Sequence, residues 1–273
     1  MVFCLSAVML YAATAAVWTH PLVFELSSAI PLGSEVTPTV TLFNFWTMLW
    51  NRLSVANGFQ GYWDAPIFFP LKDTFALSDP QPFTGLVFSF IHLLIHDVVS
   101  AYSVLILFVL IANGCAGCYF LKQLGLADTT SLLGGVFALT LPFVMRELGV
   151  LQIASIYSLL LSFAFFLRFF AKPNLTSSVG LGVSIGICFL SCSYYGVYLS
   201  LLMPFFALYF VRRVHLRYES IIGILLAAVL SLALIFPLAL KQGHSRPNVP
   251  RSLEPIAKTS ANPLHYLSLD TPW

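Results

Sequence analysis

The sequence predicts an all-α fold in which a polytopic bundle of transmembrane helices crosses a bilayer several times. Of its 273 residues, 59% are hydrophobic and 9% are charged, and the mean hydropathy is +0.89. A soluble domain carries about 25% charged residues, so this composition excludes an ordinary soluble protein. The net charge of +2, without a basic tract, also predicts no nucleic-acid partner.

Apolar segments of spanning length recur along the chain. A crossing takes about 20 helical residues, and the candidates, some of them marginal in length, are residues 2–18, 99–121, 130–145, 149–170, 177–193, 195–211 and 220–240. The stretch 83–96 is apolar but short for a crossing, so we expect a re-entrant or interfacial segment there. Peptide groups in lipid must be satisfied within their own segment, so each of the seven spans is expected to be a helix.

Basic residues of short loops predict the orientation of the bundle, because they are retained on the cytoplasmic side. If the spans alternate, Lys122, Arg168, Lys172 and the three arginines of residues 212–217 all fall at one end. We therefore expect that end to be cytoplasmic and the first loop to be extracytoplasmic.

The predicted organisation is a transmembrane domain over residues 1–240, with an extracytoplasmic first loop at 19–98. Residues 1–18 lack a basic n-region, which favours a retained helix over a signal peptide. The extracytoplasmic tail, 241–273, ends in a run of loop residues, and we interpret it as the start of a missing C-terminal region.

The first loop concentrates acidic residues beside the predicted bilayer. Five of the chain's eleven acids lie within residues 19–82: Glu25, Glu35, Asp64, Asp73 and Asp79. A carboxylate at the membrane edge can act as a general base or hold a divalent cation such as Mg²⁺ or Mn²⁺. Asp79, Glu35 and Asp64 are therefore candidate catalytic residues, although each acid can alternatively cap a turn.

Aromatic and cationic residues supply candidate substrate contacts. Residues 44–52 are predicted to form an amphipathic helix with its aromatic side chains in the membrane interface. There, Trp46 and Trp50 either anchor the helix or form a lipid-facing wall for a long-chain donor. Trp63, in a turn rich in proline and aromatic residues, is a further candidate. Arg146 either neutralises the glutamate that follows it or binds a phosphate or pyrophosphate group.

Several motifs occur in an order that resembles a known family. They are N-x-W-x-x-x-W-N at 44–51, Tyr-Trp-Asp-Ala-Pro-Ile-Phe-Phe-Pro at 62–70, Ser-Asp-Pro-Gln-Pro at 78–82, the helix end at 114–119 and Ser-Tyr-Tyr-Gly-Val-Tyr at 193–198. This order, over nearly the whole chain, resembles bacterial multi-pass proteins related to the GT-C glycosyltransferases. That superfamily includes protein mannosyltransferases and the catalytic subunits of oligosaccharyltransferase.

The resemblance implies a GT-C-like bundle in the bacterial cytoplasmic (inner) membrane, with membrane lipid and a polyprenyl-phosphate-linked sugar as partners. It implies sugar transfer on the extracytoplasmic face, with the acceptor hydroxyl activated by a carboxylate of the first loop. Relatives often carry an acid just before the N-x-W helix, whereas the nearest acid here is Glu35, several residues earlier. Val144 and Val150 stand near positions where many relatives carry Arg and His. The alternatives are a non-enzymatic flippase or assembly component for lipid-linked glycans, which needs no base, and an inactive fragment.

Overall fold

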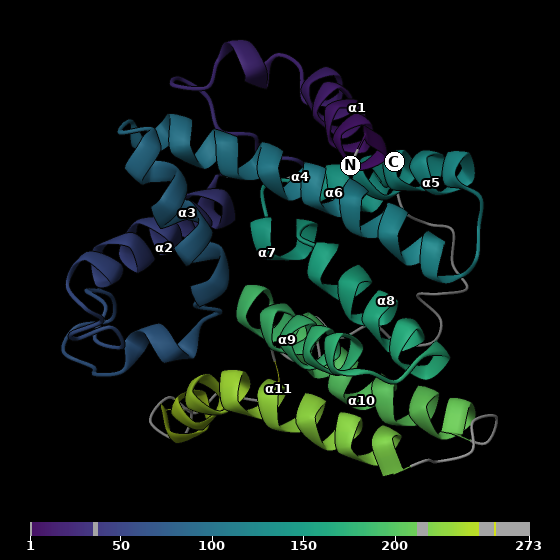
Figure 1. The fold of residues 1–273 in the computed structure, drawn as a ribbon. Coiled ribbons are helices and arrows are strands. Elements are labelled where there is room, and N and C mark those ends of the chain that lie inside the picture. The colour runs from purple at the N-terminus through teal and green to yellow at the C-terminus, as the bar shows by residue number, and fades with distance from the viewer. Residues whose placement is uncertain (1, 35–37, 212–217, 246–253, 255–273) are drawn as a thin grey trace.

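The computed structural model describes residues 2–34, 38–211, 218–245 and 254, and their regular secondary structure is entirely helical (Figure 1). The α-helices are α1 (Val2–Trp18), α2 (Thr39–Ala56), α3 (Pro82–Leu94), α4 (Val98–Gln123), α5 (Asp128–Thr140), α6 (Pro142–Arg146), α7 (Leu151–Ala154), α8 (Tyr157–Ala171), α9 (Leu175–Ser191), α10 (Ser193–Val211) and α11 (Tyr218–Ser245). Two short 3₁₀ helices, η1 (Leu22–Phe24) and η2 (Thr74–Leu77), lie in the first loop. The predicted all-α class is confirmed.

Five helical stretches are long and apolar enough to cross a membrane, which indicates a membrane protein. They are Val98–Gln123, Asp128–Arg146, Leu151–Ala171, Ser193–Phe210 and Tyr218–Ser245. The 26 residues of α4 alone extend about 39 Å at 1.5 Å per residue. Three shorter apolar helices, Phe3–Trp18, Pro82–Leu94 and Leu175–Ser191, accompany them. Two of the seven predicted spans, 2–18 and 177–193, thus correspond to 17-residue helices.

Small residues let the long helices approach closely, as expected for helices that pack in lipid. Helix α9 packs against α8, α10 and α11, while α4 packs against α1, α5 and α8. At the α9–α11 contact, a Cβ added to Gly182 would lie 2.6 Å from the Ala227 carbonyl oxygen. At the α4–α5 contact, a Cβ on Gly117 would lie 2.6 Å from the Ala138 Cβ. Larger residues at either glycine would force the helices apart.

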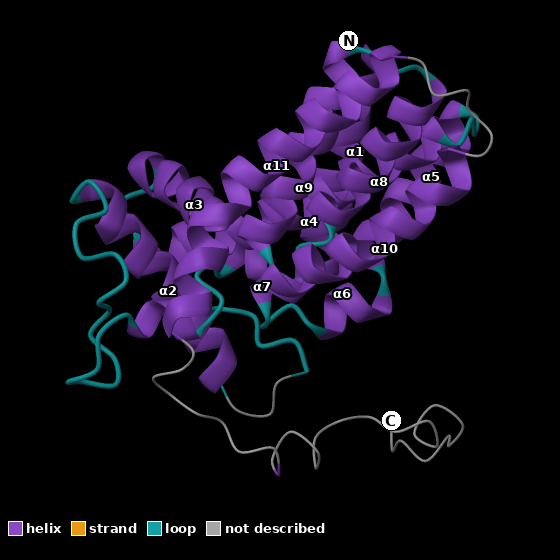
Figure 2. Ribbon diagram, turned by 90° about the horizontal axis from the view of Figure 1, so that it is seen from below, coloured by secondary structure: helices purple, strands orange, loops and turns teal. Residues whose placement is uncertain are grey.

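The first loop folds onto one end of the bundle and carries α2 and α3 (Figures 1 and 2). The backbone amide of Ser34 donates to the Arg146 carbonyl, 2.8 Å away, which joins the loop to the turn after α6. Helix α2 contacts α3 and α4. Helix α3 covers most of the stretch 83–96, which is apolar but short for a crossing. It exposes an apolar stripe formed by Leu86, Phe90, Leu93 and Leu94.

Helix α2 has the opposite amphipathicity to that of a helix in a soluble protein. It contains the predicted helix 44–52, but its buried face is almost wholly polar: Thr41, Asn44, Thr47, Met48, Asn51 and Ser54. Leu42, Phe43 and Leu53 are exposed. A buried polar face is stable only where its groups find hydrogen-bond partners, and these partners define the site described below.

The opposite end of the bundle carries the cations that predicted its orientation. Lys122, at the end of α4, pairs with Asp128 at 3.0 Å, and its ammonium also lies 3.5 Å from the centre of the Phe3 ring. Arg168, near the end of α8, donates to the Tyr119 hydroxyl at 2.9 Å. The arginines at 212, 213 and 217 lie outside the described residues. The ends of α4 and α8 that carry Lys122 and Arg168 therefore lie together, away from the first loop.

Candidate functional site

Residues 73–81, here called the crossing segment, run across the end of the bundle and are held by several helices. Lys241 of α11 forms a 2.6 Å ion pair with Asp73, and the next residue, Gln242, donates to the Ser78 carbonyl at 3.1 Å. At its other end, the Gln81 amide donates to Asn44 of α2 at 2.8 Å. These contacts fix the position of the second carboxylate of the segment.

That carboxylate is Asp79, and it lies against the break between α9 and α10. The Ser193 hydroxyl donates to Asp79 at 2.8 Å, and the Ser193 backbone amide lies 3.3 and 3.4 Å from the two carboxylate oxygens. Asp79 is half-buried, and burial raises the pKa of its carboxyl from the ordinary 3.8 to about 6, although the hydrogen bonds from Ser193 lower it. Burial therefore outweighs stabilisation by the helix N-terminus, leaving a carboxylate basic enough to accept a proton near neutral pH.

Neutral polar side chains surround the crossing segment. Asn51 of α2 donates to the Pro80 carbonyl at 2.7 Å and accepts from the Tyr62 hydroxyl at 2.9 Å. The Gln81 amide, which also donates to Asn44, lies 3.4 Å from the Gln152 side-chain oxygen of α7. Asn51 and Gln81 are each 1% exposed. These buried side chains hold the crossing segment in place and thereby position Asp79.

The other predicted carboxylates do not join Asp79. Asp64 is exposed and accepts a 2.9 Å hydrogen bond from the Asp73 backbone amide, so it stabilises the turn as its alternative role predicted. Asp73 has a left-handed backbone with φ of 60° and pairs with Lys241. Glu35 lies outside the described residues. Of the two candidate catalytic acids that the structure describes, Asp64 is exposed, whereas Asp79 is half-buried and has no ion-pair partner among the described residues.

Arg146 lies at the same end of the bundle, at the end of α6. Its guanidinium forms a 3.3 Å ion pair with Glu147, so the predicted self-neutralising pair is present. The Arg146 side chain is nevertheless 62% exposed, which leaves donors available to an anionic group. Phosphate binding by Arg146 stays a prediction.

The three candidate tryptophans form one aromatic cluster that supports the first loop. Trp46 and Trp50 stack with ring centres 6.3 Å apart, and both meet the Phe75 ring edge-on. Trp63 meets Tyr62 at 4.7 Å, and the Trp50 indole donates to the Tyr62 carbonyl at 2.9 Å. All three tryptophans are partly buried. The cluster packs the loop against α2, and contact of these rings with a lipid donor stays a prediction.

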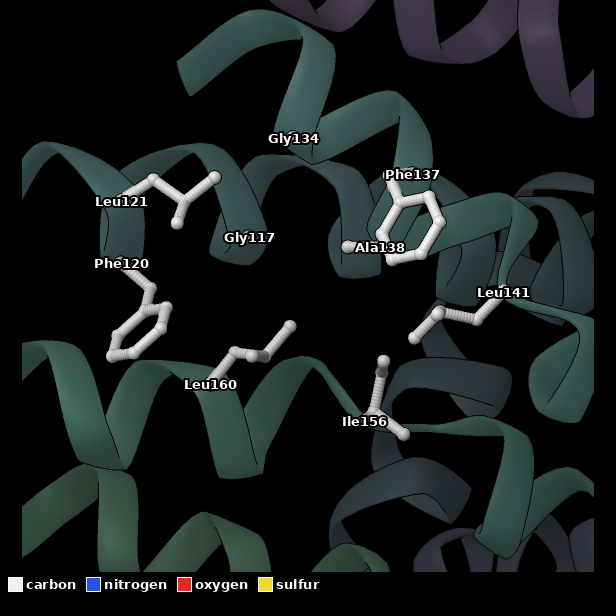
Figure 3. Close-up of a pocket in the computed structure, with 9 residues that line it drawn as sticks. All are labelled: Gly117, Phe120, Leu121, Gly134, Phe137, Ala138, Leu141, Ile156 and Leu160. Carbon is white, nitrogen blue, oxygen red and sulfur yellow. The ribbon is translucent and has the colours of Figure 1, made fainter. Parts of the chain in front are cut away.

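An apolar hollow of about 200 Å³ opens between α4, α5 and α8 (Figure 3). Figure 3 shows Phe120 and Leu121 of α4, Phe137 of α5 and Leu160 of α8 around it, and the remaining lining residues are Gly117, Gly134, Ala138, Leu141 and Ile156. Its wall is formed by apolar residues, so it suits a hydrocarbon chain rather than a polar group.

Metal-ligating residues do not gather in the described part of the chain, where no cluster of three or more His, Cys, Asp or Glu residues could hold an ion. His92 is buried and accepts a 3.0 Å hydrogen bond from the Arg52 guanidinium. The predicted Mg²⁺ or Mn²⁺ therefore has no preformed cage of protein ligands among these residues.

Comparisons with protein-family models, with curated proteins and with solved structures return no match. The class of protein thus rests on the fold and the site, which define a membrane protein with a polar site at one end of a helix bundle.

The residues around Asp79 were not predicted from the sequence, although one signal for them was present. Thr41, Asn44, Thr47, Asn51 and Ser54 recur every three or four residues, which places them on one face of a helix. The aromatic residues between them instead predicted that the opposite face of this helix is the functional one. Ser193 begins the motif at 193–198, but that motif does not indicate the contact with Asp79, which joins residues 114 positions apart.

Proposed function

We propose that this chain is a GT-C-like membrane glycosyltransferase that transfers a sugar from a polyprenyl-phosphate donor, with Asp79 as the general base. The observation that carries the proposal is the half-buried Asp79 carboxylate, whose pKa of about 6 lies close to neutral pH. General bases work best when their pKa is near the working pH. At pH 7 such a carboxylate is about 90% ionised and still able to take a proton.

In the proposed reaction, an acceptor hydroxyl oxygen forms a bond to the anomeric carbon of the donor sugar. The bond from that carbon to the phosphate oxygen breaks, and its electron pair leaves with the polyprenyl phosphate. Asp79 takes the proton of the attacking hydroxyl as the new glycosidic bond forms. Asn44 and Gln152 hold Gln81, two residues after Asp79, so these neutral amides keep the base in position without supplying a charge.

The donor requires a phosphate contact and an apolar path, and features of the first loop and of the bundle support both. The half-exposed Arg146 is the candidate phosphate ligand. Trp46, Trp50 and Trp63 are the candidate contacts for the first isoprene units, and the apolar hollow of Figure 3 suits a hydrocarbon chain further inside the bilayer. A divalent cation would be held by one of the first-loop carboxylates and would supply positive charge for the leaving phosphate, since Mg²⁺ is usually held by few carboxylates plus substrate phosphates. EDTA treatment of the assay described below tests that role.

For the membrane topology, we propose seven crossings in the bacterial cytoplasmic membrane, with the site at the extracytoplasmic end. Helices α1 and α9, of 17 residues each, extend about 26 Å, close to the roughly 30 Å of a hydrocarbon core. Both pack alongside longer spans, α1 on α4 and α9 on α11. The cations Lys122 and Arg168 at the other end support this orientation through the positive-inside rule.

The test is sugar transfer by the purified chain in proteoliposomes supplied with a panel of polyprenyl-phosphate sugars. Asp79→Asn is expected to lower kcat at least 100-fold, the lower range for loss of a general base. Asp64→Asn is the matched control, because its carboxylate is exposed and caps a turn. Full transfer by Asp79→Asn would overturn the base mechanism.

The second candidate function is a flippase or assembly component for lipid-linked glycans. The positions of Asp64 and Asp73 favour it, because these carboxylates stabilise turns and an ion pair and do not converge on a reaction centre. The same proteoliposomes distinguish the two functions. Transbilayer movement of a fluorescent polyprenyl-phosphate sugar, without formation of a new glycosidic bond in the presence of acceptors, would support the flippase and contradict the transferase.

A further inference from the structure

Asn51 is the most highly connected polar side chain around the crossing segment. Its side-chain amide donates to the Pro80 carbonyl at 2.7 Å and to the Thr47 carbonyl at 2.9 Å, and its oxygen accepts from the Tyr62 hydroxyl at 2.9 Å. Its space is also fixed, because a Cβ added to Gly85 of α3 would lie 2.4 Å from Asn51. One buried amide thus joins α2 to the turn that carries Tyr62 and to the peptide that follows Asp79.

The hydroxyl that Asn51 holds belongs to Tyr62, a group close enough to Asp79 to interact electrostatically with it. The Tyr62 ring is buried and packs edge-on against Trp63 and Phe75, so its position is set by the aromatic cluster. Burial raises the pKa of Tyr62, and the negative charge of Asp79 raises it further, as expected for neighbouring groups. The phenol has one O–H to donate, and it donates that hydrogen to Asn51.

The remaining polar groups near Asp79 are few, so one added hydrogen-bond donor is expected to change the pKa of its carboxyl. Ser193 of α10 supplies both its hydroxyl and its amide. The Cys192 thiol, at the helix break, is close enough to interact electrostatically with the carboxylate. The nearby cation on α11, Lys241, is held by Asp73 at 2.6 Å. A further O–H donor would therefore act on a carboxylate without a dedicated cationic partner.

We propose that Asn51 is a positioning residue that keeps Asp79 basic, because it fixes the peptide after Asp79 and directs the Tyr62 hydroxyl away from the carboxylate. The importance of this basicity for sugar transfer rests on the proposed function, whereas the effect on the titration of Asp79 does not. When Asn51 is shortened, the Tyr62 hydroxyl loses its acceptor and turns to Asp79. Hydrogen bonds to the ionised form of an acid lower its pKa.

The test measures the titration of Asp79 directly, by infrared spectroscopy of the full chain in nanodiscs, with the Asp79→Asn spectrum subtracted. Asn51→Ala is expected to lower the midpoint by about one pH unit, since a hydrogen bond to a charged group changes an ionisation equilibrium at least tenfold. Asn51→Ala combined with Tyr62→Phe is expected to remove most of that shift, because the mobile donor is gone. Tyr62→Phe alone is expected to leave the midpoint within a few tenths of a unit.

Ser54→Ala is the matched control, because Ser54 is also buried on this face of α2 but bonds only within its own helix, to the Trp50 carbonyl. Its midpoint is expected to stay unchanged. Asn51→Ser, which keeps a small polar side chain in the space beside Gly85, is the second variant if the alanine variant does not fold, and the same downward shift is expected. An unchanged or raised midpoint in the Asn51 variants, or an equal downward shift in the double variant, would overturn the proposal.

Activity measured on the same samples separates this proposal from the proposed function. If Asp79→Asn transfers sugar normally while Asn51→Ala still lowers the infrared midpoint, the base mechanism fails and the positioning role holds. If Asp79→Asn abolishes transfer while Asn51→Ala leaves the midpoint unchanged, the positioning role fails and the base mechanism holds. If both roles are correct, Asn51→Ala moves the acidic limb of the rate profile to lower pH together with the infrared midpoint.

Discussion

Removing the Ser193 hydroxyl should make Asp79 more basic and shift the pH dependence of sugar transfer upward. In Ser193→Ala the backbone amide still reaches the carboxylate, but the 2.8 Å side-chain hydrogen bond is lost. That bond lowers the pKa of Asp79, so its loss must raise the pKa above about 6. The sign is thus opposite to that expected for Asn51→Ala.

The magnitude follows from the strength of a hydrogen bond to a charged group, about 1.5–3 kcal/mol. One pKa unit corresponds to about 1.4 kcal/mol, and because Asp79 is half-buried the lower figure applies, which gives a shift of about one unit. The ionised fraction then falls from about 90% to about 50% at pH 7, and roughly eightfold at pH 5.5, but hardly changes at pH 8.5. The loss of activity is therefore strongly pH-dependent.

The assay is kcat/KM for sugar transfer between pH 5 and pH 9, because this quantity reports the ionisation of the free enzyme. Ser200→Ala is the control, since Ser200 lies on the same helix, is exposed and bonds to the Val197 carbonyl. Its profile is expected to match the unmodified protein. An acidic limb that stays in place or moves downward in Ser193→Ala, or an equal loss at every pH, would refute the reasoning.

Other substitutions test the packing and charge arguments through thermal unfolding in detergent. Asp79→Asn should stabilise the fold above pH 6 by about 1–2 kcal/mol, because it removes a carboxylate that burial makes costly to ionise; no gain at pH 8 would contradict this. Asp97→Ala should instead destabilise the fold at pH 8, since it removes the side chain that caps α4. Lys241→Ala should cost less than about 1 kcal/mol, the usual worth of a solvent-accessible pair. Gly182→Leu should cost about 1–3 kcal/mol or more, whereas Gly243→Ala, with open space around it, should cost little.

Composition and periodicity were enough to predict the bundle, because lipid imposes long apolar helices whose termini are marked by charge. They did not predict that the spans 130–145 and 149–170 are each divided, the first into α5 and α6 and the second into α7 and α8. Of the candidate acids, the sequence could not separate Asp64 from Asp79. Both lie in the first loop shortly before a proline, and only the long-range contact of Asp79 with Ser193 distinguishes them. Contacts between distant residues leave no local pattern to read.

Two aspartates at helix N-termini show why the setting of Asp79 matters more than its hydrogen bonds. Asp97 precedes α4 and accepts from the Ser100 amide at 2.7 Å, and these hydrogen bonds lower its pKa. Asp79 accepts from Ser193 at the start of α10, yet burial raises its pKa. Asp97 is fully exposed, so ionisation costs it little, and its stabilising effect is present at neutral pH and lost as pH falls through its folded-state pKa. Asp79 behaves in reverse, because the folded state favours its protonated form until pH exceeds about 6. A carboxylate that served only to cap α10 would be more stabilising if exposed like Asp97, so the cost of burying Asp79 supports the proposed role in accepting a proton.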